Sequence, residues 1–209
     1  MRTVNGVVIP DAWANDSTQL GVDAGFEIAH QPQWSTRTYP AAGITKLEFF
    51  STNAAPASED EGNITFPYSN TIKTMAIGLY FKNLIAVADG TGPTLASAFR
   101  DIQILSNKGV LNVQLGKKSY GPFPIWRLCA GGGPWGLIGS TGTAAAPSVV
   151  NAAQLGEPNT DAIFKLAVPV VIPAQTQAKI AISWPSALEI SDDTPLCLLF
   201  DGLECRPKQ

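Results

Sequence analysis

The chain has 209 residues and a mass of 22.1 kDa, and 15% of its residues are charged, against about 25% in a typical soluble domain. An apolar content of 45% with a net charge of −3 excludes a disordered chain, and Gly, Pro or charged residues break every apolar run before it could span a membrane as a helix. The pI near 5.1 argues against a nucleic-acid-binding protein, which normally carries a basic patch. We therefore expect a soluble globular protein with an unusually uncharged surface that partners could cover.

Residues 1–43 show no sustained hydrophobic period and are predicted to form an irregular N-terminal arm. The start of this segment has too short an apolar core for a signal peptide. The arm holds two basic and four acidic residues, so it cannot neutralise phosphates as a basic arm would. Aromatic side chains are costly to leave in water, and we expect the arm to lie on another surface through Trp13, Phe26, Trp34 and Tyr39.

From residue 44 onward, apolar and polar residues alternate and predict β-strands. The expected strands cover residues 44–50, 72–82, 110–115, 163–172, 177–184 and 196–200, with a weaker one at 63–67. The alternation places Val168 in the inward-facing set of its strand, and it places Met75 on one face with Ile77, Leu79 and Phe81. Pro169 lacks an amide donor, which indicates an edge strand or a bulge. Asp201-Gly202 predicts a type I′ turn that leads into a last strand at 203–206.

Two segments depart from the strand pattern. Residues 94–107 repeat apolar residues at helical spacing and Gly109 follows as a candidate cap, so one short helix is predicted there. Residues 128–156 contain seven glycines and no charge, which is too apolar for an ordinary solvated loop. We interpret this segment as a long loop that is buried in a neighbour or rests on a membrane surface, and a flexible Ala/Gly surface loop is the alternative.

The sequence offers little that could carry catalysis or hold a cofactor. His30 is the single histidine and lies in the predicted arm, without the further histidines of a metal site or a G-x-S-x-G motif. The G-x-G-x-x-G pattern at residues 131–136 lacks a surrounding βαβ unit. We therefore assign no catalytic residue, no cofactor and no metal, and we do not expect an enzyme.

The cysteines and the acidic clusters each have a simple interpretation and an alternative. The three cysteines, Cys129, Cys197 and Cys205, are interpreted as small buried hydrophobes. The alternative is a disulfide between Cys197 and Cys205. The acidic clusters at 59–61 and 192–193 are interpreted as solvated loop tips, although carboxylates on loops could also help to bind calcium.

Several segments taken together resemble a known class of proteins. They are the strand at 46–50, the long strand at 72–82, a helix running into residues 105–120, residues 168–175 leading into 181–185, and the closing segment 199–209. The Asp-Gly-x-x-x-Arg-Pro element at 201–207 is the most specific part. Over residues 44–209, this pattern resembles the jelly-roll capsid proteins of bacteriophages, especially tailless icosahedral phages with an internal membrane.

The resemblance implies an all-β fold, with a single eight-stranded jelly roll of two packed antiparallel sheets at 44–209, the uncharged loop 128–156 within it, and the arm 1–43 before it. It implies a structural protein of an icosahedral shell, made in the host cytoplasm and located in the virion. Its partners would be copies of itself, other capsid proteins and a possible internal membrane surface, without direct contact with nucleic acid.

Aromatic side chains are enriched at subunit interfaces, so they are the expected contact residues. We predict interface roles for Trp13, Trp34, Tyr39, Trp126 and Trp135. The same exposed aromatics could instead stack on carbohydrate, which would make the chain a receptor-binding or lectin-like spike or head domain of a virion. Sequence alone leaves this second hypothesis open.

Overall fold

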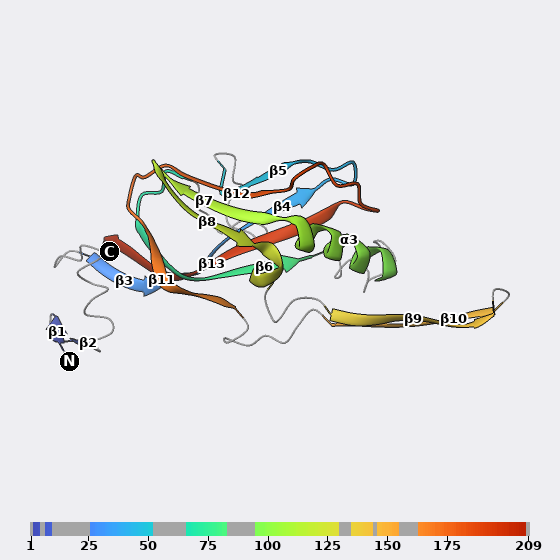
Figure 1. Cartoon of the computed structure of the whole chain (residues 1–209). Helices are drawn as coiled ribbons and strands as arrows, with labels where there is room; N and C mark the ends of the chain where they lie inside the picture. Colours follow the sequence, from blue (N-terminus) through green and yellow to red (C-terminus); the bar gives the residue numbers. More distant parts are fainter. Residues whose placement is uncertain are drawn as a thin grey trace.

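The fold is all-β, as predicted, with two curled antiparallel sheets that face each other (Figure 1). The computed structural model describes residues 2–4, 7–9, 26–51, 66–82, 95–129, 135–143, 146–154 and 163–207, and it describes side chains within 27–51, 66–82, 97–129 and 163–206.

The first sheet is built around the long C-terminal strand. Its order is β11 (Phe164–Ile172), β6 (Thr71–Phe81) and β13 (Thr194–Pro207), and the far edge of β13 pairs with both β3 (Phe26–His30) and β4 (Gln33–Tyr39). The second sheet has the order β5 (Lys46–Phe49), β12 (Ala178–Ser183), β7 (Val110–Leu115) and β8 (Lys118–Pro124). All of these neighbours pair antiparallel.

The strand order is that of an eight-stranded jelly roll. Strands β3 and β4 keep one register along β13, with Phe26 opposite Pro207 and Tyr39 opposite Thr194, so they act as a single strand interrupted at Gln31 and Pro32. Counted this way, each sheet has four strands, and the chain crosses repeatedly from one sheet to the other. This double winding confirms the predicted jelly roll.

The core lies between the two sheets and is filled by the alternating side chains that the strand pattern predicts. Ile77, Leu79 and Leu198 come from the first sheet, and Leu111, Val113, Ile180 and Ile182 come from the second. Helix α3 (Leu95–Lys108) adds Phe99, Ile102 and Leu105, as expected from its helical spacing. A one-turn helix, α4 (Ile125–Leu128), was not predicted and buries Ile125 and Leu128.

The prediction of an irregular arm over residues 1–43 is wrong for much of its length. Residues 2–4 and 7–9 form a small hairpin (β1, Arg2–Val4, and β2, Val7–Ile9), and residues 26–39 form an edge of the first sheet. The pattern misled because the inward positions of β4 carry polar residues: Gln33, Ser35 and Tyr39 are all buried. Ser35 offers its hydroxyl oxygen to the Phe50 amide at 3.1 Å, so this polarity is compatible with burial.

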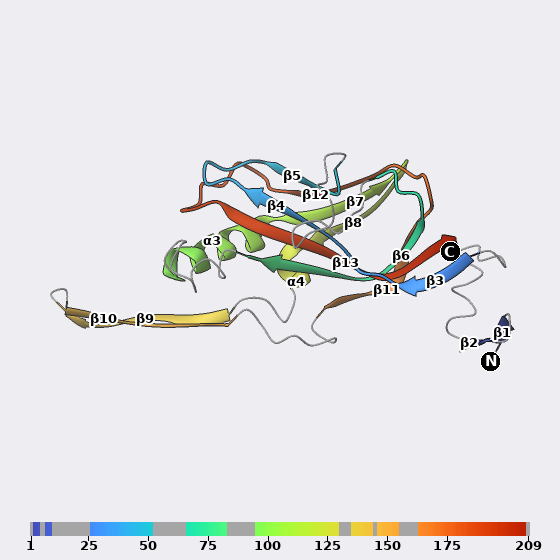
Figure 2. The same ribbon diagram turned by 180° about the vertical axis from the view of Figure 1, so that it is seen from behind.

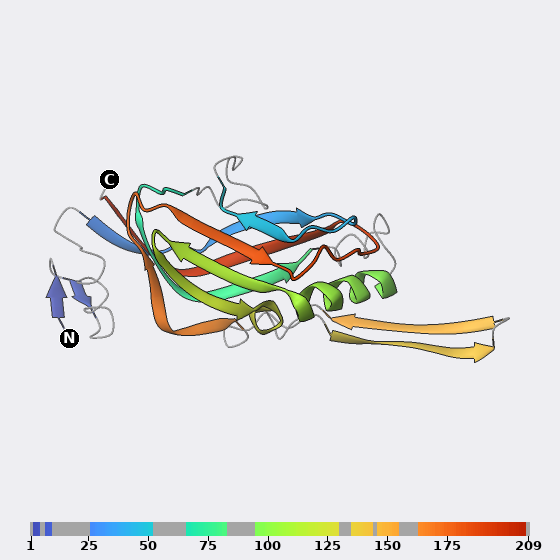
Figure 3. The ribbon, with the colours of Figure 1, turned by 45° about the horizontal axis from the view of Figure 1, so that its top comes forward.

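The prediction of a long loop at 128–156 is also wrong. Residues 135–143 (β9, Trp135–Thr143) and 146–154 (β10, Ala146–Gln154) pair over nine residues each as an antiparallel hairpin. The hairpin extends away from the two sheets in all three views (Figures 1, 2 and 3). Its glycines obscure a strand pattern in the sequence, since Gly is depleted in strands.

The first sheet contains two bulges, one that overturns expectations from the sequence and one that was predicted. The predicted turn at Asp201-Gly202 is absent, because β13 runs straight through these residues and shifts register against β6 there, leaving Met75 as the extra residue on β6. Met75 is therefore 44% exposed instead of joining Ile77 in the core. The predicted edge or bulge at Pro169 is confirmed, because β11 is an edge strand whose register shifts between Lys165 and Val170. The weaker predicted strand at 63–67 lies largely outside the described residues.

Candidate functional site

A hollow of about 440 Å³ lies on the outer face of the first sheet. It forms at the two bulges: β11 has four residues, 166–169, where β6 has only Met75, so β11 departs from regular pairing there. The wall is mostly apolar and is made by His30, Met75, Ala76, Ile163, Lys165, Leu166, Pro169, Asp201, Gly202 and Leu203. This size and character suit an apolar side chain or a small ligand.

Gly202 is the residue that lets the strands approach at the hollow. A Cβ atom at this position would overlap the backbone carbonyl of Lys73 on β6. Gly202, whose Asp-Gly pair predicted a turn, is therefore required for close backbone approach at a bulge.

A His–Asp pair marks one side of the hollow. The Nε2 atom of His30 lies 2.7 Å from Oδ1 of Asp201, and the two side chains are 63% and 31% exposed. Among the described lining residues there is no Ser, Thr or Cys beside this pair. The pair can supply hydrogen bonds at the rim, where the His30 side chain is exposed.

Apolar surface continues beside the hollow. Val168, in the bulged part of β11, is 79% exposed, which contradicts its predicted inward position. A small second cluster lies on the same outer face, with Leu203 and Cys205 buried and Ile28 and Val171 partly buried around them. The exposed apolar side chains of this face are therefore Val168 and Met75, and exposed apolar surface can mark an interaction site.

The β9–β10 hairpin is the second candidate feature, and within the chain its strand β10 approaches helix α3. Among the described residues, β9 and β10 form hydrogen-bonded sheet only with each other. Its strands lie within the uncharged segment 128–156. A two-stranded hairpin is marginally stable at best by itself in water, and its open edges can pair with another chain.

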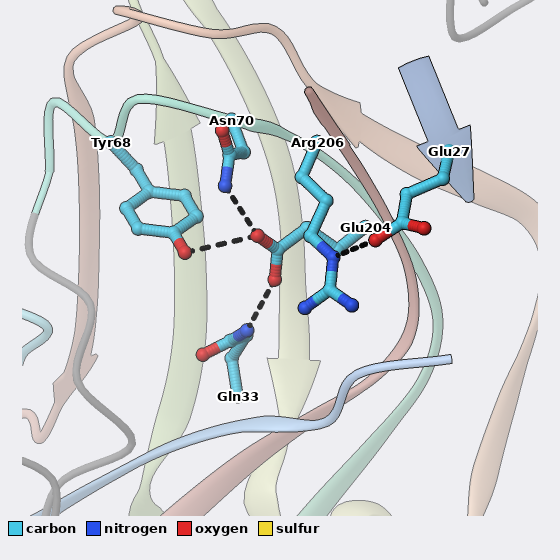
Figure 4. A network of polar contacts seen from close by, with 6 residues as sticks. All are labelled: Glu27, Gln33, Tyr68, Asn70, Glu204 and Arg206. Atoms are coloured by element: carbon cyan, nitrogen blue, oxygen red, sulfur yellow. Dashed lines mark hydrogen bonds and ion pairs between the residues drawn. The ribbon is translucent and has the colours of Figure 1, made fainter. Parts of the chain in front are cut away.

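A buried carboxylate fastens the N-terminal strands to the sheet (Figure 4). Glu204 on β13 is 4% exposed and accepts hydrogen bonds from Gln33 (3.1 Å), Tyr68 (3.1 Å) and Asn70 (2.5 Å). Burial, with a further contribution from the charge of Glu204, raises the pKa of Tyr68. The donors come from β4 and from the segment before β6, so Glu204 joins both segments to β13 through hydrogen bonds.

The exposed pair of Arg206 and Glu27 lies beside this network (Figure 4). Nε of Arg206 is 2.6 Å from Oε1 of Glu27, which joins β13 to β3. The hydrogen bond to Glu27 raises the pKa of Arg206, and the attraction of the same carboxylate adds to the shift. Surface pairs of this kind contribute little to stability.

All three cysteines are free and buried, which confirms their interpretation as small hydrophobes and excludes the Cys197–Cys205 disulfide in this structure. Burial raises the pKa of Cys129 to about 11, and burial also raises the pKa of Cys205. A thiol with such a pKa is almost entirely protonated at neutral pH and reacts slowly.

The predicted interface residues differ in how accessible the structure leaves them. Tyr39 is wrong as an interface residue, because it is fully buried in the chain's own core, 4.6 Å from the ring of Trp184. Trp126 on α4 is 59% exposed and thus accessible to a partner. Trp34 is half-buried on β4, opposite Leu199.

The side chains of the other two predicted interface residues are not among those that the structure describes. Trp13 lies outside the described residues, and Trp135 begins β9, where only the backbone is described. Trp34 belongs to the first sheet, and Trp126 lies on α4, which follows the edge strand β8 of the second sheet.

The acidic clusters give no metal centre among the residues described. No group of three or more His, Cys, Asp or Glu side chains there could hold a metal ion. Asp193 instead accepts a hydrogen bond from the Ala41 amide at 2.8 Å. Asp101, buried on α3, accepts from the backbone amides of Ser191 and Asp192 and so anchors this loop. The cluster at 59–61 lies outside the described residues.

Comparison with known proteins adds no identity to this geometry. No protein-family model, curated protein or solved structure matches the chain. Within the described residues, no helix is both long and apolar enough to cross a membrane. The class that the fold defines is therefore an all-β, jelly-roll-like protein.

Proposed function

We propose that the chain is a structural virion protein, a jelly-roll subunit that associates with copies of itself and with other capsid proteins in an icosahedral phage shell. The observation that carries the proposal is an eight-stranded jelly roll from which an uncharged hairpin extends, and among the described residues the two strands of this hairpin pair only with each other. The resemblance of residues 44–209 to phage jelly-roll capsid proteins points the same way.

The distribution of charge supports association as the working activity. Subunits of a shell present apolar and uncharged surface to several neighbours, and obligate interfaces resemble a domain core cut in half. The chain concentrates such surface in the hairpin, in the hollow on the outer face of the first sheet, and in the exposed Trp126. We assign no catalytic residue in this proposal.

The acidic character of the N-terminal segment extends the proposal to the genome. Residues 1–43 hold four acidic and two basic residues, so the genome would be separated from this protein by other proteins or by an internal membrane. A filter-binding assay at low salt should detect no tight binding to DNA or RNA. Tight, salt-sensitive binding would contradict this part of the proposal.

The mass and symmetry of the native assembly test the proposed function. Electron microscopy and light scattering of purified native material should reveal a megadalton particle with icosahedral symmetry. A discrete oligomer of a few subunits that binds glycans would favour the receptor-binding or lectin-like head domain instead. A monomer at all concentrations, in the presence of the other virion proteins, would contradict both.

A further inference from the structure

We propose that the β9–β10 hairpin of one copy docks in the apolar hollow on the outer face of the first sheet of the next copy. The inference rests on the proposed self-association and names the two surfaces that make the contact. It commits to a second copy of this chain as the occupant of the hollow.

The two surfaces match in chemistry. The hollow is lined mainly by apolar side chains, among them Met75, Leu166 and Leu203, and the hairpin lies in a segment without any charged residue. Lys165 also lines the hollow and already has a partner, so an uncharged hairpin would bury no unpaired charge there. At the rim, His30 and Asp201 already satisfy each other, 2.7 Å apart.

The two surfaces cannot meet within one copy in the arrangement seen. The hairpin runs away from β11, which forms one wall of the hollow, in each of the three views (Figures 1, 2 and 3). Nine residues per strand span about 30 Å, long enough to reach a neighbouring molecule. An intermolecular contact is the arrangement that brings hairpin and hollow together.

Docking by side chains is favoured over the addition of a strand to β11. Pro169 has no amide hydrogen, and β11 departs from regular pairing between Lys165 and Val170, so this edge is a poor template for a new strand. A hollow of about 440 Å³ instead provides a place for apolar side chains to insert.

The contact has a geometric consequence for assembly. Hairpin and hollow are different surfaces, so each copy donates one and receives the other in a head-to-tail contact. Such contacts close into rings or continue from copy to copy, and every subunit uses both surfaces. This is the pattern that a multi-subunit shell requires.

The first test places a charge in the hollow. Met75→Glu changes a residue of β6 that is 44% exposed, and Tyr80→Glu is its matched control, because Tyr80 lies on the same strand, is 42% exposed and is not among the hollow's lining residues. Met75→Glu should raise the protein concentration needed for half-assembly by about tenfold or more, since a buried unpaired carboxylate is costly. Tyr80→Glu should assemble like the wild type. Urea midpoints for both variants establish that each is folded.

The second test traps the contact. Single cysteines at positions 137–143 of the hairpin, one at a time, are mixed with the Val168→Cys protein and oxidised. Disulfides between copies should form at alternating positions of β9, and none should form with Gln114→Cys on β7 of the other sheet. The three native thiols are buried and should give little background.

The outcomes separate this inference from the proposed function. If wild-type particles form and Met75→Glu assembles as well as Tyr80→Glu, without cross-links to position 168, the docking is overturned while a shell protein remains. If cross-links form at 168 but the assembly is a small ring, the docking stands and the shell is refuted. A co-purified lipid found in the hollow by native mass spectrometry, without cross-links, would make an acyl chain the occupant and overturn the docking.

Discussion

Removing the Tyr39 hydroxyl should destabilise the fold far more than removal of a single oxygen usually does. The hydroxyl accepts hydrogen bonds from the amides of Ile44 (3.1 Å) and Leu188 (2.9 Å), and it lies 3.0 and 3.1 Å from their carbonyl oxygens, to which it can donate. Tyr39→Phe keeps the ring and creates no large cavity, but it leaves two amide hydrogens without an acceptor.

Each buried donor left without an acceptor costs about 1–3 kcal/mol. The amide of Ile44 is only partly buried and can recover part of this cost from water, so we expect a total loss of about 2–4 kcal/mol. For a chain of this size, that loss lowers the melting temperature by roughly 10 °C. Urea unfolding followed by fluorescence is a suitable assay, because Trp184 packs edge-on against Tyr39.

Tyr80→Phe is the matched control, because Tyr80 is 42% exposed on the long strand β6 of the same sheet and should lose little by the same change. The two variants should differ in urea midpoint with unchanged slopes. Equal midpoints for Tyr39→Phe and Tyr80→Phe would refute the reasoning that this hydroxyl joins the 39–44 and 188 segments.

Three further changes test other parts of the structure. Glu204→Gln should lower the free energy of unfolding by about 2–3 kcal/mol in urea titrations, because the amide can no longer accept all three hydrogen bonds; wild-type stability would mean the network is dispensable. Gly202→Ala should cost about 3 kcal/mol or more at the bulge, whereas Gly116→Asn, in an open turn at φ +56°, should cost less than about 1 kcal/mol by the same assay. The free energy of unfolding should fall as pH rises from about 9 to about 11, because the folded chain holds the Cys129 proton more tightly than the unfolded chain; Cys129→Ala should flatten this slope, and an unchanged slope would contradict it.

The parts of the fold that the sequence predicts well are those in which apolar residues occupy the buried positions. Strands β7 and β12 alternate Leu, Val and Ile with polar residues, and their predicted bounds agree with the structure to within a residue. Helix α3 buries Ala98, Phe99, Ile102 and Leu105 at the predicted spacing. In these elements, local pattern and tertiary packing agree.

Strand β4 escaped prediction because tertiary contacts, and not hydrophobicity, make its inward side chains compatible with the core. Gln33 donates to Glu204, which is distant in sequence, and Tyr39 bonds to backbone groups at 188. A single sequence gives no sign of these partners, so buried polar residues resemble those of an irregular arm. The three hydrogen bonds that the buried Glu204 carboxylate accepts likewise could not be predicted from the sequence.

The hollow was missed for a related reason. It depends on bulges in two different strands coming side by side, and register is a property of the pairing of strands. Pro169 gave a correct local signal for one bulge. Asp201-Gly202 marked a special backbone position but was interpreted as a turn. The need for a glycine there comes from the close approach of Lys73, which is known only once β6 is paired with β13.

The protection of strand edges is uneven across the molecule, and this unevenness bears on assembly. The edge strand β8 carries Lys118, Pro122 and Pro124, and the edge strand β11 carries Lys165 and Pro169, features that discourage unwanted pairing. Strand β9 of the hairpin has neither a proline nor a charge. A chain that protects one edge of each main sheet in this way and leaves the edge of β9 without such residues favours association through the hairpin. The low charge of the whole sequence thus has a local physical meaning, because an edge or face without charge is one that a partner can cover at little desolvation cost.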